Sequence, residues 1–305
     1  MRPSLAFLPA LLCSLAAAPF APAQTLAPNL TDLSAQDLPT AIHQQEILLE
    51  QPAAHADAAA WWTLARLDQD AARYADAEHA WTHALSLVNS NDRATRANLL
   101  DGLGTVYVET GDFTRAEPLE NEALALRESL HDSTGEGRSW MHLAMLALGR
   151  HDVATAAHNA QLAADRLLNS TAATPQEQMT ALITLSFVRC AQNLCSAAIP
   201  LLKKAHHIAL TSSQAQSFPA AFTDFLLGYA DWRDGNLHAA ARLMKSGSAG
   251  MRTQLGSNHP TYISAMTQYA AFLDQTHHSA EAAAIRAELS QSPSSAGTMT
   301  AALHP

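Results

Sequence analysis

The chain contains 15 histidines, a residue type that can bind a metal. His79 and His83 are four positions apart, so on a helix their imidazoles lie one turn apart and can chelate a single zinc ion. The glutamate of the zinc-peptidase pattern is missing, however, and no third ligand is in register with the pair. We therefore predict a solvated helix face at this position, and no metal or cofactor.

The sequence does not support nucleophilic catalysis any better than it supports a metal site. The sequence has no Gly-x-Ser-x-Gly elbow, no cysteine within a catalytic histidine signature and no glycine-rich phosphate loop. We predict that the protein is not an enzyme. An active site assembled from several helices would leave no local motif, and this alternative stays open.

Cys190 and Cys195 are the cysteines that follow the N-terminal apolar segment, and they bracket a predicted turn. In an oxidising compartment such a pair predicts a disulfide. The alternative is that Cys195 fills the apolar position that Phe113 fills in an equivalent segment, as described below.

The N-terminal segment has the features of a secretory signal. Arg2 precedes an apolar stretch from Leu5 to about Phe20, and a small-x-small motif ends at Ala23. We predict a signal peptide over residues 1–23, cleavage after Ala23, and export to the periplasm or the cell exterior, without stable membrane insertion after cleavage. The net charge of -10, without a basic stripe, argues against nucleic-acid binding.

The remainder of the chain shows a repeat of 39 to 42 residues. A small residue is followed twelve positions later by alanine in six pairs: Ala65/Ala77, Gly104/Ala116, Ala144/Ala156, Ser186/Ala198, Gly228/Ala240 and Ala270/Ala282. Flanking positions keep the same phase, with leucine or tyrosine just before the small residue and, in most units, alanine or glycine nineteen residues after it. Each unit is typical of two antiparallel helices whose small residues allow close approach, and Gly111 and Gly235 end the first helix of their units.

The second unit resembles a tetratricopeptide repeat at nearly every signature position: Leu100, Leu103, Gly104, Tyr107, Gly111, Phe113, Ala116 and Ala123. The longer spacing, the segment Ala116–Leu119 and the segment Leu255–Pro260 resemble the kinesin-light-chain subtype. The resemblance implies an all-α, right-handed superhelical solenoid of about six helix pairs over residues 58–290. We expect residues 24–57 to form an N-terminal segment with a capping helix over 38–50, and residues 291–305 to form a disordered tail. Ala72, His151, Asn193 and His277 stand where the family pattern has a turn glycine, so these turns match the pattern less well, although asparagine tolerates the left-handed conformation.

In proteins of this kind the first helices of the units line a concave groove that holds a peptide. The resemblance therefore implies an interaction scaffold for a partner protein or an extended peptide segment. A glycan or small-molecule binder that uses the aromatic residues is the alternative. The predicted groove residues are Trp62, Arg66, Asp101, Thr105, Arg138, Met141, Met145, Ile183, Phe187, Phe222, Phe225, Tyr229, Trp232 and Arg233. For the stripe from Phe222 to Trp232, exposure in the groove and burial under the neighbouring unit are both open.

Overall fold

The computed structural model of the chain describes residues 37–212 and 217–291. Every regular element in these two ranges is a helix. The predicted signal peptide, its cleavage after Ala23, and the predicted tail beyond Gln291 lie outside the described residues. None of the described helices combines the length and the apolar character needed to cross a membrane.

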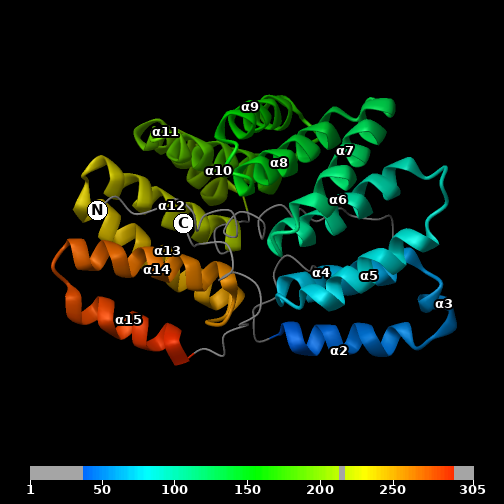
Figure 1. The fold of residues 1–305 in the computed structure, drawn as a ribbon, viewed down its shortest axis with the longest axis horizontal. Coiled ribbons are helices and arrows are strands. Elements are labelled where there is room, and N and C mark those ends of the chain that lie inside the picture. The colour runs from blue at the N-terminus through cyan, green and yellow to red at the C-terminus, as the bar shows by residue number, and fades with distance from the viewer. Residues whose placement is uncertain (1–36, 213–216, 292–305) are drawn as a thin grey trace.

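Six helix pairs follow one another along the chain (Figure 1). They are α4 (Ala58–Asp70) with α5 (Tyr74–Leu87), α6 (Arg93–Glu109) with α7 (Phe113–Ser129), α8 (Ser133–Gly149) with α9 (Val153–Asn169), α10 (Pro175–Ala191) with α11 (Cys195–Thr211), α12 (Phe218–Asp234) with α13 (Leu237–Leu255), and α14 (Pro260–Gln275) with α15 (Ser279–Gln291). The predicted all-helical solenoid of about six pairs is confirmed.

Two further helices precede the first pair. α2 (Leu38–Leu49) occupies the place of the predicted capping helix, and the four-residue α3 (Pro52–His55) connects it to α4. Leu38, Ile42 and Leu49 are buried where α2 packs on α4. This contact covers one end of the array, as a terminal element of a repeat protein must do.

Aspartates set the register of the central helices. Asp92, Asp112, Asp132 and Asp152 stand twenty residues apart, and each precedes a helix of 17 residues. Each carboxylate accepts a hydrogen bond from the backbone N–H three residues later, over 2.8 to 3.1 Å. An aspartate at this position satisfies a backbone donor that the first turn leaves free, and so fixes where each helix begins.

The turns inside the pairs share one backbone conformation, whether or not they contain glycine. A residue one or two positions after the first helix has a positive φ in all six pairs: Ala72 56°, Gly111 80°, His151 62°, Asn193 62°, Gly235 92° and His277 65°. In every case the next N–H donates to a carbonyl five residues earlier, the bond of a Schellman motif. The turns without glycine, which match the family pattern less well, therefore adopt the same geometry as the turns with glycine.

This conformation has a cost where a side chain is present. A left-handed backbone costs a non-glycine residue roughly 1–2 kcal/mol. Replacing Ala72 by Gly is therefore expected to raise the free energy of unfolding by about 1 kcal/mol, measured by urea denaturation. The matched reverse variant is Gly111→Ala, at a position where a Cβ atom would meet nothing within 4 Å, so only the backbone term changes. Gly111→Ala should lower the free energy of unfolding by about the same amount. A gain in stability from Gly111→Ala would contradict a backbone cost at this turn position.

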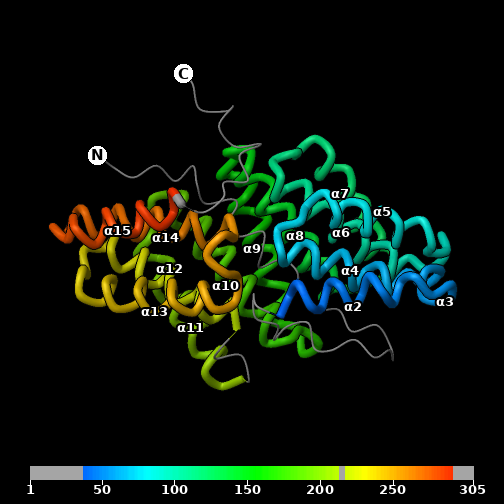
Figure 2. The backbone as a smooth tube through the Cα atoms, turned by 90° about the horizontal axis from the view of Figure 1, so that it is seen from below, coloured from blue at the N-terminus to red at the C-terminus, as the bar shows by residue number. Residues whose placement is uncertain are grey.

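Curvature follows from how the pairs stack. Successive first helices contact one another, α4 with α6, α6 with α8, α8 with α10 and α10 with α12. No pair of successive second helices makes comparable contacts in the described chain. The first helices therefore form the tighter, inner wall of the array and the second helices the outer wall (Figures 1 and 2).

Candidate functional site: the inner wall and a buried ionic cluster

Most of the predicted groove residues lie inside the protein. Met141, Met145, Ile183, Phe187, Asp101 and Thr105 are each at most 5% exposed. The apolar members pack into the continuous core between neighbouring pairs. Thr105 donates its hydroxyl to the carbonyl oxygen of Asp101, at 2.8 Å, within its own helix. The prediction that these side chains line an open groove is wrong as to their exposure, because successive first helices pack directly on one another through this face.

The aromatic stripe on α12 is also buried. Phe222, Phe225, Tyr229 and Trp232 are 0 to 5% exposed. The indole of Trp232 packs edge-on against Phe272 of α14, with ring centroids 5.6 Å apart, and donates to Oε1 of Gln275 at 3.0 Å. The stripe thus belongs to the core between the last two pairs, and burial under the neighbouring unit is the correct alternative.

Four predicted residues keep some exposure, namely Trp62, Arg66, Arg138 and Arg233. Arg138 contacts Glu177 at 2.8 Å and Asp132 at 3.6 Å, and Arg233 contacts the hydroxyl of Tyr229 at 3.3 Å. Arg138 therefore links α8 to α10, whereas the contact of Arg233 with Tyr229 lies within α12.

Trp62 and Arg66 lie on α4, the first helix of the inner wall, and we call this end of the wall its front. Trp62 packs edge-on against Trp81, and Arg66 is 3.5 Å from Asp70. Glu109 of α6 reaches the same region, where Gln69 donates to it at 3.1 Å. Burial, opposed by the Gln69 hydrogen bond, raises the pKa of Glu109 to about 8. This front surface therefore offers an aromatic ring, a cation and a carboxyl group that favours its protonated form near neutral pH.

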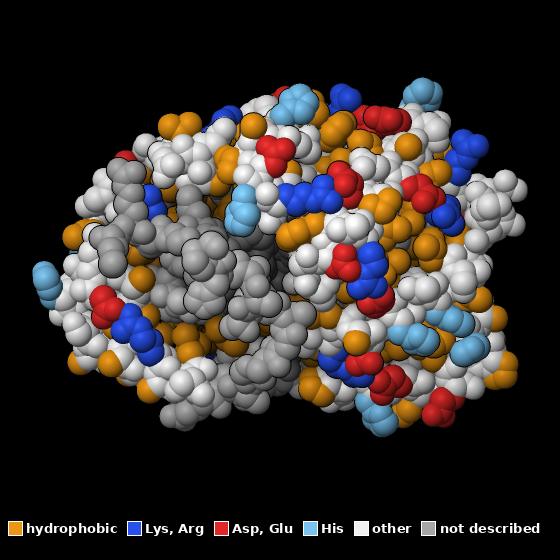
Figure 3. Space-filling view, in the orientation of Figure 1, with side chains coloured by type: hydrophobic (Ala, Val, Ile, Leu, Met, Phe, Trp, Pro, Cys, Tyr) orange, Lys and Arg blue, Asp and Glu red, His pale blue; other side chains and the backbone are white. Residues whose placement is uncertain are grey.

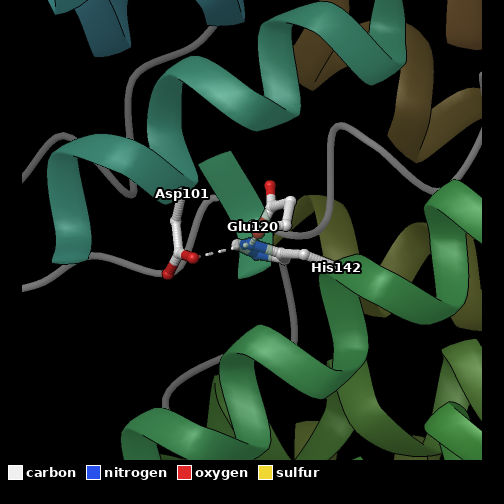
Figure 4. A group of neighbouring side chains, drawn as sticks. All are labelled: Asp101, Glu120 and His142. Carbon is white, nitrogen blue, oxygen red and sulfur yellow. Dashed lines mark hydrogen bonds and ion pairs between the residues drawn. The ribbon is translucent and has the colours of Figure 1, made fainter. Parts of the chain in front are cut away.

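A buried ionic cluster lies where α6, α7 and α8 meet (Figure 4). Nδ1 of His142 is 3.2 Å from Oε2 of Glu120 and 3.6 Å from Oδ1 of Asp101. Arg127, 2% exposed, forms an ion pair with the other oxygen of Asp101. Its guanidinium also donates to Ser139 at 2.6 Å and to Asn98 at 3.0 Å. Gly104 makes room for the cluster, since a Cβ atom there would stand 2.4 Å from a Glu120 oxygen.

The pKa values in the cluster follow from burial and from the opposite charges. Burial alone would lower the pKa of His142, but the Glu120 and Asp101 carboxylates outweigh it and raise that pKa to about 10. Burial would raise the pKa of Asp101, yet Arg127 and His142 hold it below its ordinary value. Burial raises the pKa of Glu120 to about 8. His142 is therefore a cation near neutral pH, held between two acidic groups.

The three side chains that meet here are also a set that can ligate metals. One ligand atom from each of Asp101, Glu120 and His142 lies within 4.8 Å of the others. A metal would need a neutral imidazole, but the raised pKa of His142 favours its protonated form, and Arg127 already pairs with Asp101. The cluster fits an internal ion-pair network that holds three helices together better than it fits a metal centre.

The sequence contained a signal for this cluster. Glu120 lies four residues after Ala116 and three before Ala123, on the face of α7 that those small residues bury, and Arg127 continues the same face. Charged residues in core register are rare unless they are paired. Each pairing partner lies on another helix, so the local pattern predicts that partners exist without identifying them.

The structure brings Cys190 and Cys195 together across the turn between α10 and α11. The two sulfurs are bonded, with a Cα–Cα distance of 4.2 Å, and both residues are 6% exposed. The disulfide and the apolar role of Cys195 are therefore compatible at this turn. Phe187 and Tyr229 line a small apolar pocket beside Cys190.

Comparisons with known proteins agree with this architecture. Residues 57–129, which span the first two helix pairs, match the family model described as tetratricopeptide repeat. That stretch is similar to the tetratricopeptide repeat family. No curated protein matches the chain.

Solved structures share the fold over most of the chain. The apo form of RapI aligns with a TM-score of 0.59 at 13% identity, covering 83% of this chain and 89% of RapI. A Rap protein complexed with Competence and Sporulation Factor aligns with a TM-score of 0.61 at 13% identity, covering 84% and 79%. A Podosopora anserina kinesin light chain with nearly identical TPR-like repeats aligns at 16% identity and a TM-score of 0.46, covering 62% and 92%. The Rap likenesses show a shared helical-repeat fold.

Proposed function

We propose that this protein is an exported, non-enzymatic scaffold that binds an extended segment of a partner polypeptide on the inner wall of its solenoid. The observation that carries the proposal is the direct stacking of first helices from α4 to α12, which builds one continuous concave wall from separate helix pairs. Such a wall presents side chains from several units to one extended ligand. The complex of a Rap protein of similar fold with Competence and Sporulation Factor supports a ligand of this class.

The front of the wall supplies suitable contacts. Trp62 offers a flat, partly exposed apolar surface, and the guanidinium of Arg66, 12% exposed, can donate to a peptide carbonyl or carboxylate. The aromatic stripe of α12 is unsuited to this role because it is buried. The same burial removes the support for a glycan binder, and the closed ionic cluster at α6 to α8 gives no support to a dispersed active site.

Site-specific photocrosslinking tests this proposal. A photoreactive amino acid replaces Trp62 on the inner wall or, as the matched control, Lys203, which is exposed on the outer helix α11. The chain is then exposed to an extract of its native host, and crosslinked segments are identified by mass spectrometry. We expect one polypeptide segment to crosslink from position 62 and not from position 203.

Affinity measurements with that segment, made as a synthetic peptide, complete the test. Trp62→Ala is expected to weaken binding about 10-fold or more, and Lys203→Ala to leave the dissociation constant unchanged. Equal crosslinking from both positions, or a larger loss from Lys203→Ala, would contradict a binding site on the inner wall.

A further inference from the structure

Three histidines from two helices meet around Trp61 at the front of the array. His55 ends α3, and His79 and His83 lie one turn apart on α5. The ring centroids of His55 and His83 are 5.3 Å apart, and those of His79 and His83 are 6.4 Å apart. Figure 3 shows a group of histidine side chains side by side on this part of the surface, over α3 and α5.

Trp61 holds the histidines in place. Its indole Nε1 donates to the carbonyl oxygen of His55 at 2.9 Å, which fixes the end of α3 against α4. The ring of Trp61 is 8% exposed and contacts all three imidazoles, with centroid distances of 4.2 Å to His83, 5.3 Å to His55 and 6.0 Å to His79. The indole thus provides a rigid apolar floor beneath the rings.

The surroundings of His83 favour its neutral imidazole. Burial, and then the neighbouring His55 and His79, lower the pKa of His83. Nε2 of His83 is buried and has no hydrogen-bond partner among the described residues. A neutral imidazole nitrogen without a partner is the form in which histidine ligates a metal.

The distances between the rings also suit the binding of one metal ion by more than one imidazole. Imidazoles bound to one Zn²⁺ at ~2.0–2.1 Å have ring centres roughly 5 Å apart. The His55–His83 distance already meets this requirement. His79 is exposed, so its ring can turn toward His83 to complete the set.

We propose that His55, His79 and His83 form a surface site for a divalent transition metal that prefers imidazole ligands, such as Zn²⁺ or Cu²⁺. Three protein ligands leave the fourth tetrahedral position open to solvent, as in zinc sites that accept an exogenous ligand. The sequence suggested only the His79–His83 pair. The third ligand is 24 residues away, and the short helix α3 brings it back to α5.

Isothermal titration of the full chain with ZnCl₂ at pH 7.5 tests the site. We expect one equivalent of Zn²⁺ to bind, and His55→Ala and His83→Ala each to weaken binding ~10- to 100-fold or more, at least the loss seen when a ligand's supporting partner is removed. His158→Ala, an exposed histidine on α9, should leave binding unchanged. His55→Gln, which keeps side-chain size and polarity, should behave as His55→Ala does, and circular dichroism verifies that each variant is folded.

Tryptophan fluorescence gives a second readout. Because Trp61 lies 4.2 Å from His83, Cu²⁺ at the site should quench part of the emission, and His83→Ala should abolish that quenching. Absence of a one-equivalent binding event would overturn the proposal. So would a folded His55→Ala variant with wild-type affinity, because the metal would then be held by the His79–His83 pair alone.

Discussion

Replacing Arg127 by Met is expected to lower the free energy of unfolding by about 3–5 kcal/mol. Met fills much of the same volume, so the loss comes from charge rather than from a cavity. Asp101, 5% exposed, would lose its guanidinium partner and remain as a buried carboxylate, and Ser139 and Asn98 would lose their donors. Urea denaturation at pH 7, followed by circular dichroism, measures the effect.

Two further variants separate this explanation from a general loss of packing. Arg115→Met removes an exposed arginine that pairs with Glu78 and Asp112 on the surface, and should lower the free energy of unfolding much less than Arg127→Met does. In the double variant Arg127→Met with Asp101→Leu, both charges of the buried pair are gone, so the combined loss should be smaller than the sum of the two single losses. Strictly additive losses would show that Arg127 and Asp101 contribute independently, against the ion-pair account.

The helix pairs and their order could be predicted from the sequence because one requirement recurs in every unit. The two helices of a pair approach closely only where a small residue lies at the contact. Ala77, Ala116, Ala156, Ala198 and Ala240 are accordingly all fully buried. The positions of the turns followed from the same phase, even where Ala72 or His151 replaces glycine.

Exposure on the inner wall could not be predicted in the same way. A helix of this array packs against its own partner and against two neighbouring first helices, so its sequence shows apolar residues on several faces. Trp232 lies away from the face of Gly228, yet it is buried, and it packs against Phe272 of the next pair. Whether such a face is exposed or buried depends on how closely neighbouring units pack. The periodicity within one helix does not report this distance.

The ionic cluster and the grouping of His55 with His79 and His83 escaped prediction for a related reason. Both depend on residues that are distant in sequence and meet only after the pairs stack. His142 lies 22 residues from Glu120, and His55 lies 28 residues from His83. The charged residue in core register and the paired histidines were visible, while the partners that give them a role were not.

The backbones of α12 and α13 approach each other closely at Gly247, and this contact supports the second large effect. A Cβ atom at Gly247 would stand 2.5 Å from the backbone nitrogen of Phe225 and 2.6 Å from the carbonyl oxygen of Ala221. Equivalent positions in four other pairs hold alanine, namely Ala84, Ala123, Ala163 and Ala205, all fully buried. The α12–α13 pair is therefore too close for the methyl group that those pairs accommodate.

Gly247→Ala is accordingly expected to destabilise the protein by about 2–3 kcal/mol, measured as the shift in urea midpoint at constant slope. The sign of the stability change distinguishes the two effects, because alanine stabilises a helix interior by about 1 kcal/mol relative to glycine. Ser246→Ala is the matched control, because Ser246 lies one residue earlier and is exposed on the same helix. Only the helix propensity changes there, so the variant should be neutral or slightly stabilising. If Gly247→Ala also stabilised the protein, the two helices would have to separate without losing contacts, and close backbone packing would not hold this pair together.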